Sequence, residues 1–144
     1  ALPKGGHFTL LDDAYNANPV SMAAAIASLG SAQPGPGGRR IAVLGDMLEL
    51  GPQSPELHRA LAPALAEANV DAVFSCGALM RELHDHLPER LRAGYAANAG
   101  EGREMVASAI RAGDVVLIKG SNGSGLHKIA AVLADGSAFN LTEA

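Results

Sequence analysis

The amino-acid sequence predicts an α/β fold, in which a doubly wound, mostly parallel sheet of about five to six strands carries helices on both faces. Strand-like and helix-like patterns alternate along the 144 residues, which is the order of a chain built from β–α–β units. The strand-like runs are aliphatic, as in VVLI at residues 115–118, and such runs are typical of strands buried on both faces. Aromatic residues make up only 3% of the chain, and its small aliphatic side chains favour helices packed closely on a parallel sheet.

Length and composition predict one domain, residues 1–144, in the class of soluble globular proteins. The formal net charge of −4 argues against non-specific nucleic-acid binding, which requires clustered basic side chains. No apolar run approaches the ~20 residues that span a bilayer. Cys76 is the only cysteine and lies in an apolar run, so we expect a buried, unreactive thiol in a protein of the reducing cytoplasm.

The first strand pattern covers residues 8–11, and the helix after it has signals at both ends. Asn18 is a good cap, Pro19 suits the first helical position, and Gly30 ends the helix. Three apolar side chains share one face of this helix: Met22, Ile26 and Leu29. The glycines and prolines of residues 33–38 predict a loop.

Residues 41–44 carry the second strand pattern. We expect Ser54 to cap a helix that begins at Pro55 and is kinked at Pro63, because proline removes a backbone hydrogen bond. The side chains of this helix expected to face the core are Leu57, Leu61, Ala64 and Ala68.

The third strand pattern at residues 72–76 and a weaker fourth one at residues 91–96 are separated by a short helix pattern at residues 79–87. Asn98 and Glu101 resemble a capping box at the start of the next helix. The side chains of that helix expected to face the core are Met105, Val106, Ala109 and Ile110.

The fifth strand pattern at residues 115–118 leads into a glycine-rich loop at residues 119–125, and residues 137–141 suit an added edge strand. The inward side chains of the last helix are Leu126, Ile129, Ala130 and Leu133. About five β–α units joined by right-handed crossovers give a Rossmann-like sheet.

Polar residues follow the first strand, at the sheet edge where ligands of open α/β folds bind. Tyr15, Asn16 and Asn18 offer a planar ring and two amides, which suit stacking on and hydrogen bonding to an adenine base. Asp12 and Asp13 offer carboxylates for ribose hydroxyls, and strand alternation turns only one of them towards a ligand. The alternative is a turn and helix cap, since Asp and Asn favour such positions for local reasons.

Two further loops end strands at the same edge. Lys119 begins the glycine-rich loop before the last helix, where backbone N–H groups, the helix dipole and the ammonium favour an anion. The alternative is a flexible turn with a solvated lysine. Asp46 and Glu49 lie in a loop between Gly45 and Gly51, and here a ligand site and a plain tight turn explain the spacing equally well.

The sequence predicts no catalytic group and no metal site within this chain. It lacks the Gly-x-x-x-x-Gly-Lys-Ser/Thr phosphate loop, and no Ser-His-Asp arrangement is evident. The five histidines have no ligand-like spacing, so we expect surface or structural roles for all of them.

Three segments resemble the carboxyl-terminal domain of the Mur ligases: DDAYNANP at residues 12–19, GDMLELG at 45–51 and LIKGS at 117–121. The resemblance covers essentially the whole chain. The second segment is similar to family members that add D-alanyl-D-alanine to UDP-N-acetylmuramoyl-tripeptide in the synthesis of the peptidoglycan precursor.

The resemblance implies a three-domain enzyme that uses ATP and Mg²⁺ and activates the substrate carboxylate as an acyl phosphate. The amino-terminal domain would hold the uridine nucleotide, and the central domain the phosphate loop and the metal. The carboxyl-terminal domain would close over ATP and the dipeptide, so that this chain is inactive by itself.

The resemblance also implies roles for individual residues. The nucleotide side would comprise Asp13, on the ribose, with Tyr15, Asn16 and Asn18. The dipeptide side would comprise Lys119, Ser121, Asp46 and Glu49. We separate the two sides because Lys119 ends the fifth strand whereas Asp13 follows the first. Asn122 stands where the family has an arginine.

A non-catalytic nucleotide-binding module and a phosphorylation-switch receiver domain are the alternatives. The receiver also has an acidic pair after its first strand and a lysine after its fifth. It requires a phosphoacceptor aspartate at the end of the third strand, where this chain has Ser75, Cys76 and Gly77.

Overall fold

The computed structural model describes residues 7–13 and 17–135, and its centre is a five-stranded parallel sheet. The strand order is β1-β5-β2-β3-β4, and all four neighbouring pairs are parallel. The strands are β1 (Thr9–Asp13), β2 (Arg40–Gly45), β3 (Ala72–Cys76), β4 (Arg92–Ala96) and β5 (Val115–Lys119). The predicted α/β class and parallel sheet are therefore confirmed.

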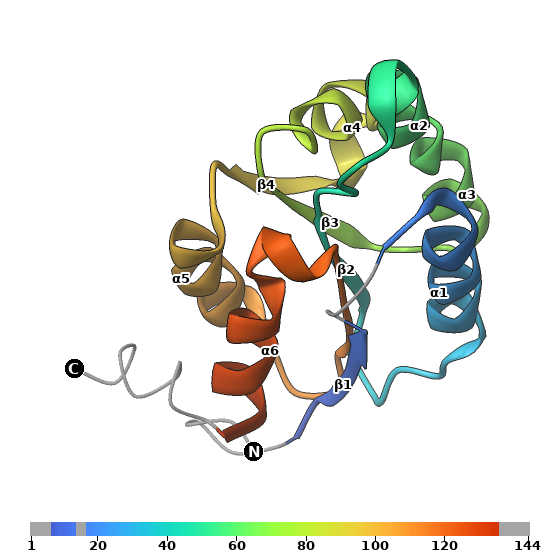
Figure 1. The fold of residues 1–144 in the computed structure, drawn as a ribbon. Coiled ribbons are helices and arrows are strands. Elements are labelled where there is room, and N and C mark those ends of the chain that lie inside the picture. Colours follow the sequence, from blue (N-terminus) through green and yellow to red (C-terminus); the bar gives the residue numbers. More distant parts are fainter. Residues whose placement is uncertain (1–6, 14–16, 136–144) are drawn as a thin grey trace.

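Helices cover both faces of the sheet. They are α1 (Pro19–Ser31), α2 (Ser54–Arg59), α3 (Leu61–Glu67), α4 (Arg81–His86), α5 (Ala99–Ala109) and α6 (Leu126–Asp135). Helices α5 and α6 lie on one face, and α1 to α4 lie on the other (Figure 1). Short 3₁₀ turns occupy Gly51–Gln53, Glu89–Leu91 and Asn122–Ser124.

Strand β5 divides the hydrophobic core into two layers. All five of its residues are buried, and the aliphatic run at residues 115–118 predicts this for four of them. Val116 and Ile118 pack on the side of α5 and α6, whereas Val115 and Leu117 pack on the side of α1 and α3. Because successive side chains of a strand point to opposite faces, β5 contributes apolar side chains to both layers of the core.

The ends of β1 and α1 differ from the sequence prediction. Strand β1 continues to Asp13 instead of ending at residue 11, because Asp12 and Asp13 extend the pairing with β5. Helix α1 runs one residue past Gly30. This glycine serves close packing, since a Cβ at Gly30 would lie 3.0 Å from the Cβ of Ala68.

The region around Pro63 contains two helices instead of one kinked helix. Helix α2 ends at Arg59, whose carbonyl would be the partner of an N–H at Pro63 in a continuous helix. Ser54 is the first residue of α2 and makes no side-chain cap, so the predicted cap is wrong. The buried face also includes His58 and Leu65, which the prediction omitted.

The other helices agree with the prediction more closely. Asn98 caps α5 by accepting a hydrogen bond from the N–H of Glu101 at 3.0 Å, but Glu101 accepts in turn from Ala97 N instead of Asn98 N. All four predicted inward residues of α6 are buried: Leu126, Ile129, Ala130 and Leu133. The predicted edge strand at 137–141 lies outside the described residues.

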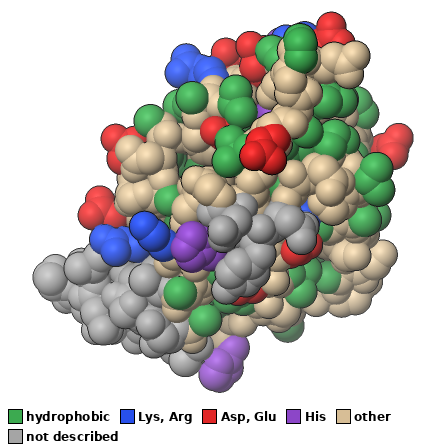
Figure 2. Space-filling view, in the orientation of Figure 1, with side chains coloured by type: hydrophobic (Ala, Val, Ile, Leu, Met, Phe, Trp, Pro, Cys, Tyr) green, Lys and Arg blue, Asp and Glu red, His purple; other side chains and the backbone are tan. Residues whose placement is uncertain are grey.

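Acidic and basic side chains are interspersed on the face drawn in Figure 2. Within residues 7–13 and 17–135, no helix has both the length and the apolar character needed to cross a membrane.

Candidate functional site

The loops after β1, β2 and β5 meet at the carboxyl edge of the sheet, and Ser121 joins all three. Its N–H donates to the carbonyl of Asp46 at 3.0 Å. Its Oγ accepts from the N–H of Leu48 at 2.9 Å and donates to the carbonyl of Ala17 at 3.4 Å. Ser121 therefore holds the predicted ligand-binding edge together, a role that its position after LIKG did not reveal.

An ion pair joins Lys119 to Asp13 at this edge. The two residues are register partners in neighbouring strands, and Lys119 Nζ lies 2.7 Å from Asp13 Oδ2. The lysine side chain is 1% exposed, whereas the aspartate side chain is 49% exposed. A buried ammonium without a counter-charge is costly, so the pair fixes both side chains.

This geometry excludes one alternative for Lys119 and corrects one expectation. The lysine is buried, which excludes the solvated lysine of a flexible turn. Its strand also lies beside β1, so the separation of Lys119 from Asp13 that the chain order suggested is wrong. Strands β1 and β5 come from opposite ends of the chain but are neighbours in the sheet, so Asp13 and Lys119 lie in one site.

Asp12 and Asp13 differ in environment, as strand alternation predicts. Asp12 is exposed and lies opposite Ile118 in the pairing with β5, whereas Asp13 is half-buried against Lys119. Only Asp13 is therefore held at the sheet edge by a charged partner in β5.

Asn18 forms the capping box of α1. Its Oδ1 accepts from the N–H of Ser21 at 2.8 Å, and its own N–H donates to Ser21 Oγ at 3.0 Å. The amide oxygen therefore has a structural partner, and a nucleotide contact by this residue stays a prediction. The other two predicted adenosine contacts, Tyr15 and Asn16, lie outside the described residues.

The carboxylate of Asp46 connects the loop after β2 to the loop after β3. Its Oδ1 accepts from the N–H of Met80 at 2.8 Å. Burial raises the pKa of Asp46, and hydrogen bonds from the backbone of Met80 and Leu79 oppose that shift. Gly77 has φ +110°, and a Cβ there would lie 2.5 Å from Asp46 Oδ1, so the contact requires glycine.

His58, which was not predicted as a site residue, holds the loop after β2 in place by a hydrogen bond. It is fully buried, its Nε2 accepts from the N–H of Met47 at 3.0 Å, and its Nδ1 lies 2.7 Å from the carbonyl of Ser54. Because Nε2 accepts, the ring proton is on Nδ1 and is donated to Ser54. The expected structural role is confirmed for this histidine.

Glu49 occupies the exposed part of this loop in a left-handed conformation. Its φ is +62°, which costs about 1–2 kcal/mol for a residue with a Cβ. The hydrogen bonds of Met47 with His58 and of Leu48 with Ser121 hold the backbone on its amino side. An exposed carboxylate on a restrained loop is suited to meet a ligand.

Among the described residues, no group of three or more histidine, cysteine, aspartate or glutamate side chains is arranged to hold a metal ion. Cys76 is buried, as its apolar surroundings predict.

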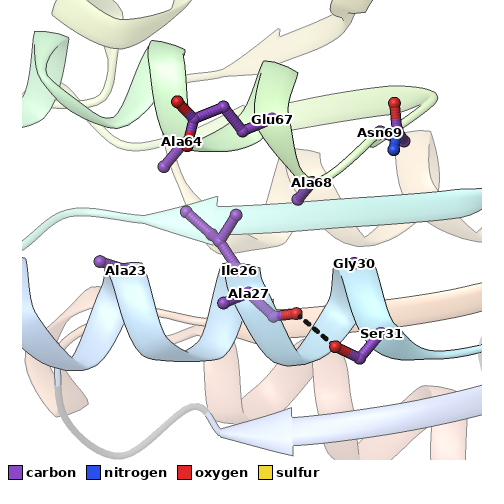
Figure 3. A pocket seen from close by; sticks show the side chains of 9 residues that line it. All are labelled: Ala23, Ile26, Ala27, Gly30, Ser31, Ala64, Glu67, Ala68 and Asn69. Atoms are coloured by element: carbon purple, nitrogen blue, oxygen red, sulfur yellow. Dashed lines mark hydrogen bonds between the residues drawn. The ribbon is translucent and has the colours of Figure 1, made fainter.

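A groove of about 490 Å³ lies between α1 and α3, away from the converging loops. Most of its wall is formed by small side chains that face each other across the two helices, including Ala23, Ala27, Ala64 and Ala68 (Figure 3). It extends to Gly30 and Asn69, at the carboxyl ends of these helices and hence towards the amino edge of the sheet. Its composition does not suit the polar, partly anionic ligand that the sequence predicts.

Comparison with known proteins identifies the family. A family model described as "Mur ligase, glutamate ligase domain" matches residues 2–122. The UDP-N-acetylmuramoyl-tripeptide–D-alanyl-D-alanine ligase of Rickettsia prowazekii is 34% identical over 117 residues, which cover 81% of this chain and 25% of that protein. The ligase of the same name from Mycobacterium tuberculosis is 33% identical over 156 residues, covering 92% and 30%.

Solved structures agree with these relatives. MurF ligase from Thermotoga maritima in complex with ADP has a TM-score of 0.70 and 25% identity, covering 86% of this chain and 27% of that one. A MurF from Acinetobacter baumannii has a TM-score of 0.72 and 26% identity, covering 91% and 29%. The chain spans only 25–30% of the length of these four proteins. Because the family model matches well over half of its residues, the chain belongs to the Mur ligase family and carries the family's glutamate ligase domain.

Proposed function

We propose that this chain is the carboxyl-terminal domain of a three-domain, ATP-dependent ligase of the cytoplasm. The reaction is the addition of D-alanyl-D-alanine to UDP-N-acetylmuramoyl-tripeptide through an acyl phosphate. The names of the relatives support the reaction, and the ADP in the Thermotoga maritima structure supports the nucleotide. The amino-terminal and central domains, with the phosphate loop, would complete the enzyme.

The observation that carries this proposal is the half-exposed carboxylate of Asp13, fixed by Lys119 where three loops meet. A carboxylate accepts hydrogen bonds from vicinal hydroxyl groups, such as those of a ribose. Asp13 is accessible to such donors because about half of its side chain is exposed, at 49%. We assign Asp13 to the nucleotide, with Tyr15, Asn16 and Asn18 on the same side.

The loop after β2 and Ser121 form the side that we assign to the dipeptide. Glu49 is the exposed carboxylate there, whereas Asp46 and Ser121 are held in backbone hydrogen bonds that shape the loop. Glu49 would therefore meet the substrate, and Asp46 and Ser121 would keep its loop in place. We assign Mg²⁺ to the other domains, since the described residues offer no cluster of ligands for it.

Replacement of Asp13 in the full-length ligase tests this function. Asp13→Ala removes a charge-assisted acceptor worth about 1.5–3 kcal/mol, so KM for ATP should rise roughly 10- to 150-fold. Asp12→Ala is the matched control: it removes the exposed neighbouring carboxylate and should change KM for ATP little. KM for ATP is measured from product formation by each purified variant, and the folding of each variant is checked by thermal unfolding. Equal losses in the two variants would show that Asp13 has no special role.

A further inference from the structure

Lys119 cannot meet a substrate directly in the arrangement that the structure shows. Its side chain is 1% exposed, and β5 lies between β1 and β2 with all of its residues buried. The chain that follows is closely packed too: a Cβ at Gly120 would lie 2.7 Å from Ser124 Oγ and 3.1 Å from Gly45 Cα. Contact between the ammonium and a diffusing ligand would require this end of the sheet to open.

The half-exposed partner of the lysine is available to a ligand. Asp13 Oδ2 accepts from Lys119 Nζ at 2.7 Å, yet about half of the aspartate side chain faces solvent, at 49% exposure. An ionised carboxylate has about four lone-pair sites, so a bond to one ammonium leaves acceptor capacity for hydroxyl donors. The pair therefore has a buried cationic end and an accessible anionic end.

We propose that Lys119 is a positioning residue that acts through Asp13 on the nucleotide side of the site. It anchors Oδ2 and restricts rotation of the half-exposed carboxylate, while Asp13 supplies the counter-charge of the buried ammonium. This inference rests on the proposed function, because it takes Asp13 as the group that meets the nucleotide. It replaces the expectation that Lys119 binds the carboxylate of the dipeptide.

A double-mutant cycle in the full-length ligase tests the proposal, with KM for ATP, KM for D-alanyl-D-alanine and the dissociation constant of ADP as readouts. Lys119→Met keeps a long unbranched side chain, one atom shorter than that of lysine, and removes the charge. It should raise KM for ATP and the ADP dissociation constant roughly 5- to 30-fold and leave KM for the dipeptide unchanged. In the double variant, Lys119→Met should add less than twofold to the effect of Asp13→Ala alone, because each substitution removes the same Lys119–Asp13 ion pair.

Thermal unfolding provides a second readout. Asp13→Ala leaves the Lys119 ammonium buried without this counter-charge, so Tm should fall, and adding Lys119→Met should restore part of the loss. Lys119→Arg retains a cation for Asp13 with a different shape, and it serves if Lys119→Met does not fold. Its expected effect is a smaller rise in KM for ATP, again with no change for the dipeptide.

Three results would overturn the inference. A rise in KM for D-alanyl-D-alanine with an unchanged KM for ATP would place Lys119 on the dipeptide. Additive effects of the two substitutions would show that Lys119 acts independently of Asp13. A wild-type enzyme without ligase activity would refute the proposed function and this inference with it, whereas an active wild type with additive variants would refute the inference alone.

Discussion

Cys76 shows how packing changes the chemistry of a single side chain. It is the last residue of β3 and is 2% exposed. Burial, helped by the negative charge of Asp46, raises the pKa of its thiol to about 12. The thiolate is the nucleophilic form of cysteine, so this side chain is unreactive at neutral pH although it is close to the carboxyl edge of the sheet.

The raised pKa of Cys76 predicts a loss of stability in alkali. The ordinary pKa is 9.0 and the folded value is about 12, so the unfolded chain loses this proton first. The stabilisation is complete below pH 9 and declines towards pH 12, by at most about 1.4 kcal/mol per pH unit. Urea unfolding of the wild type and of Cys76→Ala at pH 8 and pH 10 measures this decline. From pH 8 to pH 10, the free energy of unfolding should fall more in the wild type than in Cys76→Ala. Equal losses would contradict the assignment.

At the scale of an element, α1 owes its start to residues that are adjacent in sequence. Pro19 occupies the first helical position, and Asn18 and Ser21 exchange hydrogen bonds between side chain and backbone. The same asparagine is a candidate nucleotide contact, so its substitution has to separate a cap from a ligand contact.

Asn18→Ala should lower the free energy of unfolding by about 1 kcal/mol, because one helix N–H loses its acceptor. Asn18→Asp keeps an acceptor at the cap and should stay close to the wild type. Val20→Ala is the control: it changes a side chain of α1 that is 80% exposed and should shift stability by less than about 0.5 kcal/mol. If Asn18→Asp is stable but has a raised KM for ATP in the full-length ligase, the amide contacts the nucleotide. Equal destabilisation by Ala and Asp would refute the capping role.

In the whole molecule, the carboxyl edge of the sheet carries the candidate site, whereas the amino edge carries a structural carboxylate. The carboxyl edge holds the Lys119–Asp13 pair and the three converging loops. The amino edge is fastened by Asp114, which is fully buried. Its carboxylate accepts from the backbone N–H of Arg39 at 2.9 Å, the Arg39 guanidinium at 2.9 Å and the N–H of Arg111 at 2.7 Å.

Asp114→Ala should lower the free energy of unfolding by about 3 kcal/mol, because two backbone N–H groups lose their acceptor and the Arg39 guanidinium loses its carboxylate partner. KM for ATP should not change in the variant that remains folded, since Asp114 lies at the opposite edge from Asp13. Asp85→Ala is the matched control: it breaks an exposed ion pair with Arg81 and should have little effect on stability. Urea unfolding and steady-state kinetics test both statements, and a raised KM for ATP in folded Asp114→Ala would contradict the division between the edges.

Local sequence patterns predict the kind and order of the elements, because the apolar period, the caps and the glycines act over a few residues. Strand β3 has the predicted bounds of residues 72–76, and the predicted inward side chains of α1 are buried. The sequence also predicts that polar groups lie at the ends of β1, β2 and β5. The parallel sheet brings those ends to one edge.

The contacts among these groups depend on the tertiary structure. Asp13 and Lys119 are 106 positions apart, and they pair because β5 lies directly beside β1. The same order brings Ser121 to Leu48, 73 positions away. The buried His58 reaches Met47 only because α2 folds back under the loop between them. Local patterns do not specify strand order or the packing of a loop on a helix, since these depend on the free energy of the whole sheet, and so the carboxyl edge was predicted whereas its contacts were not.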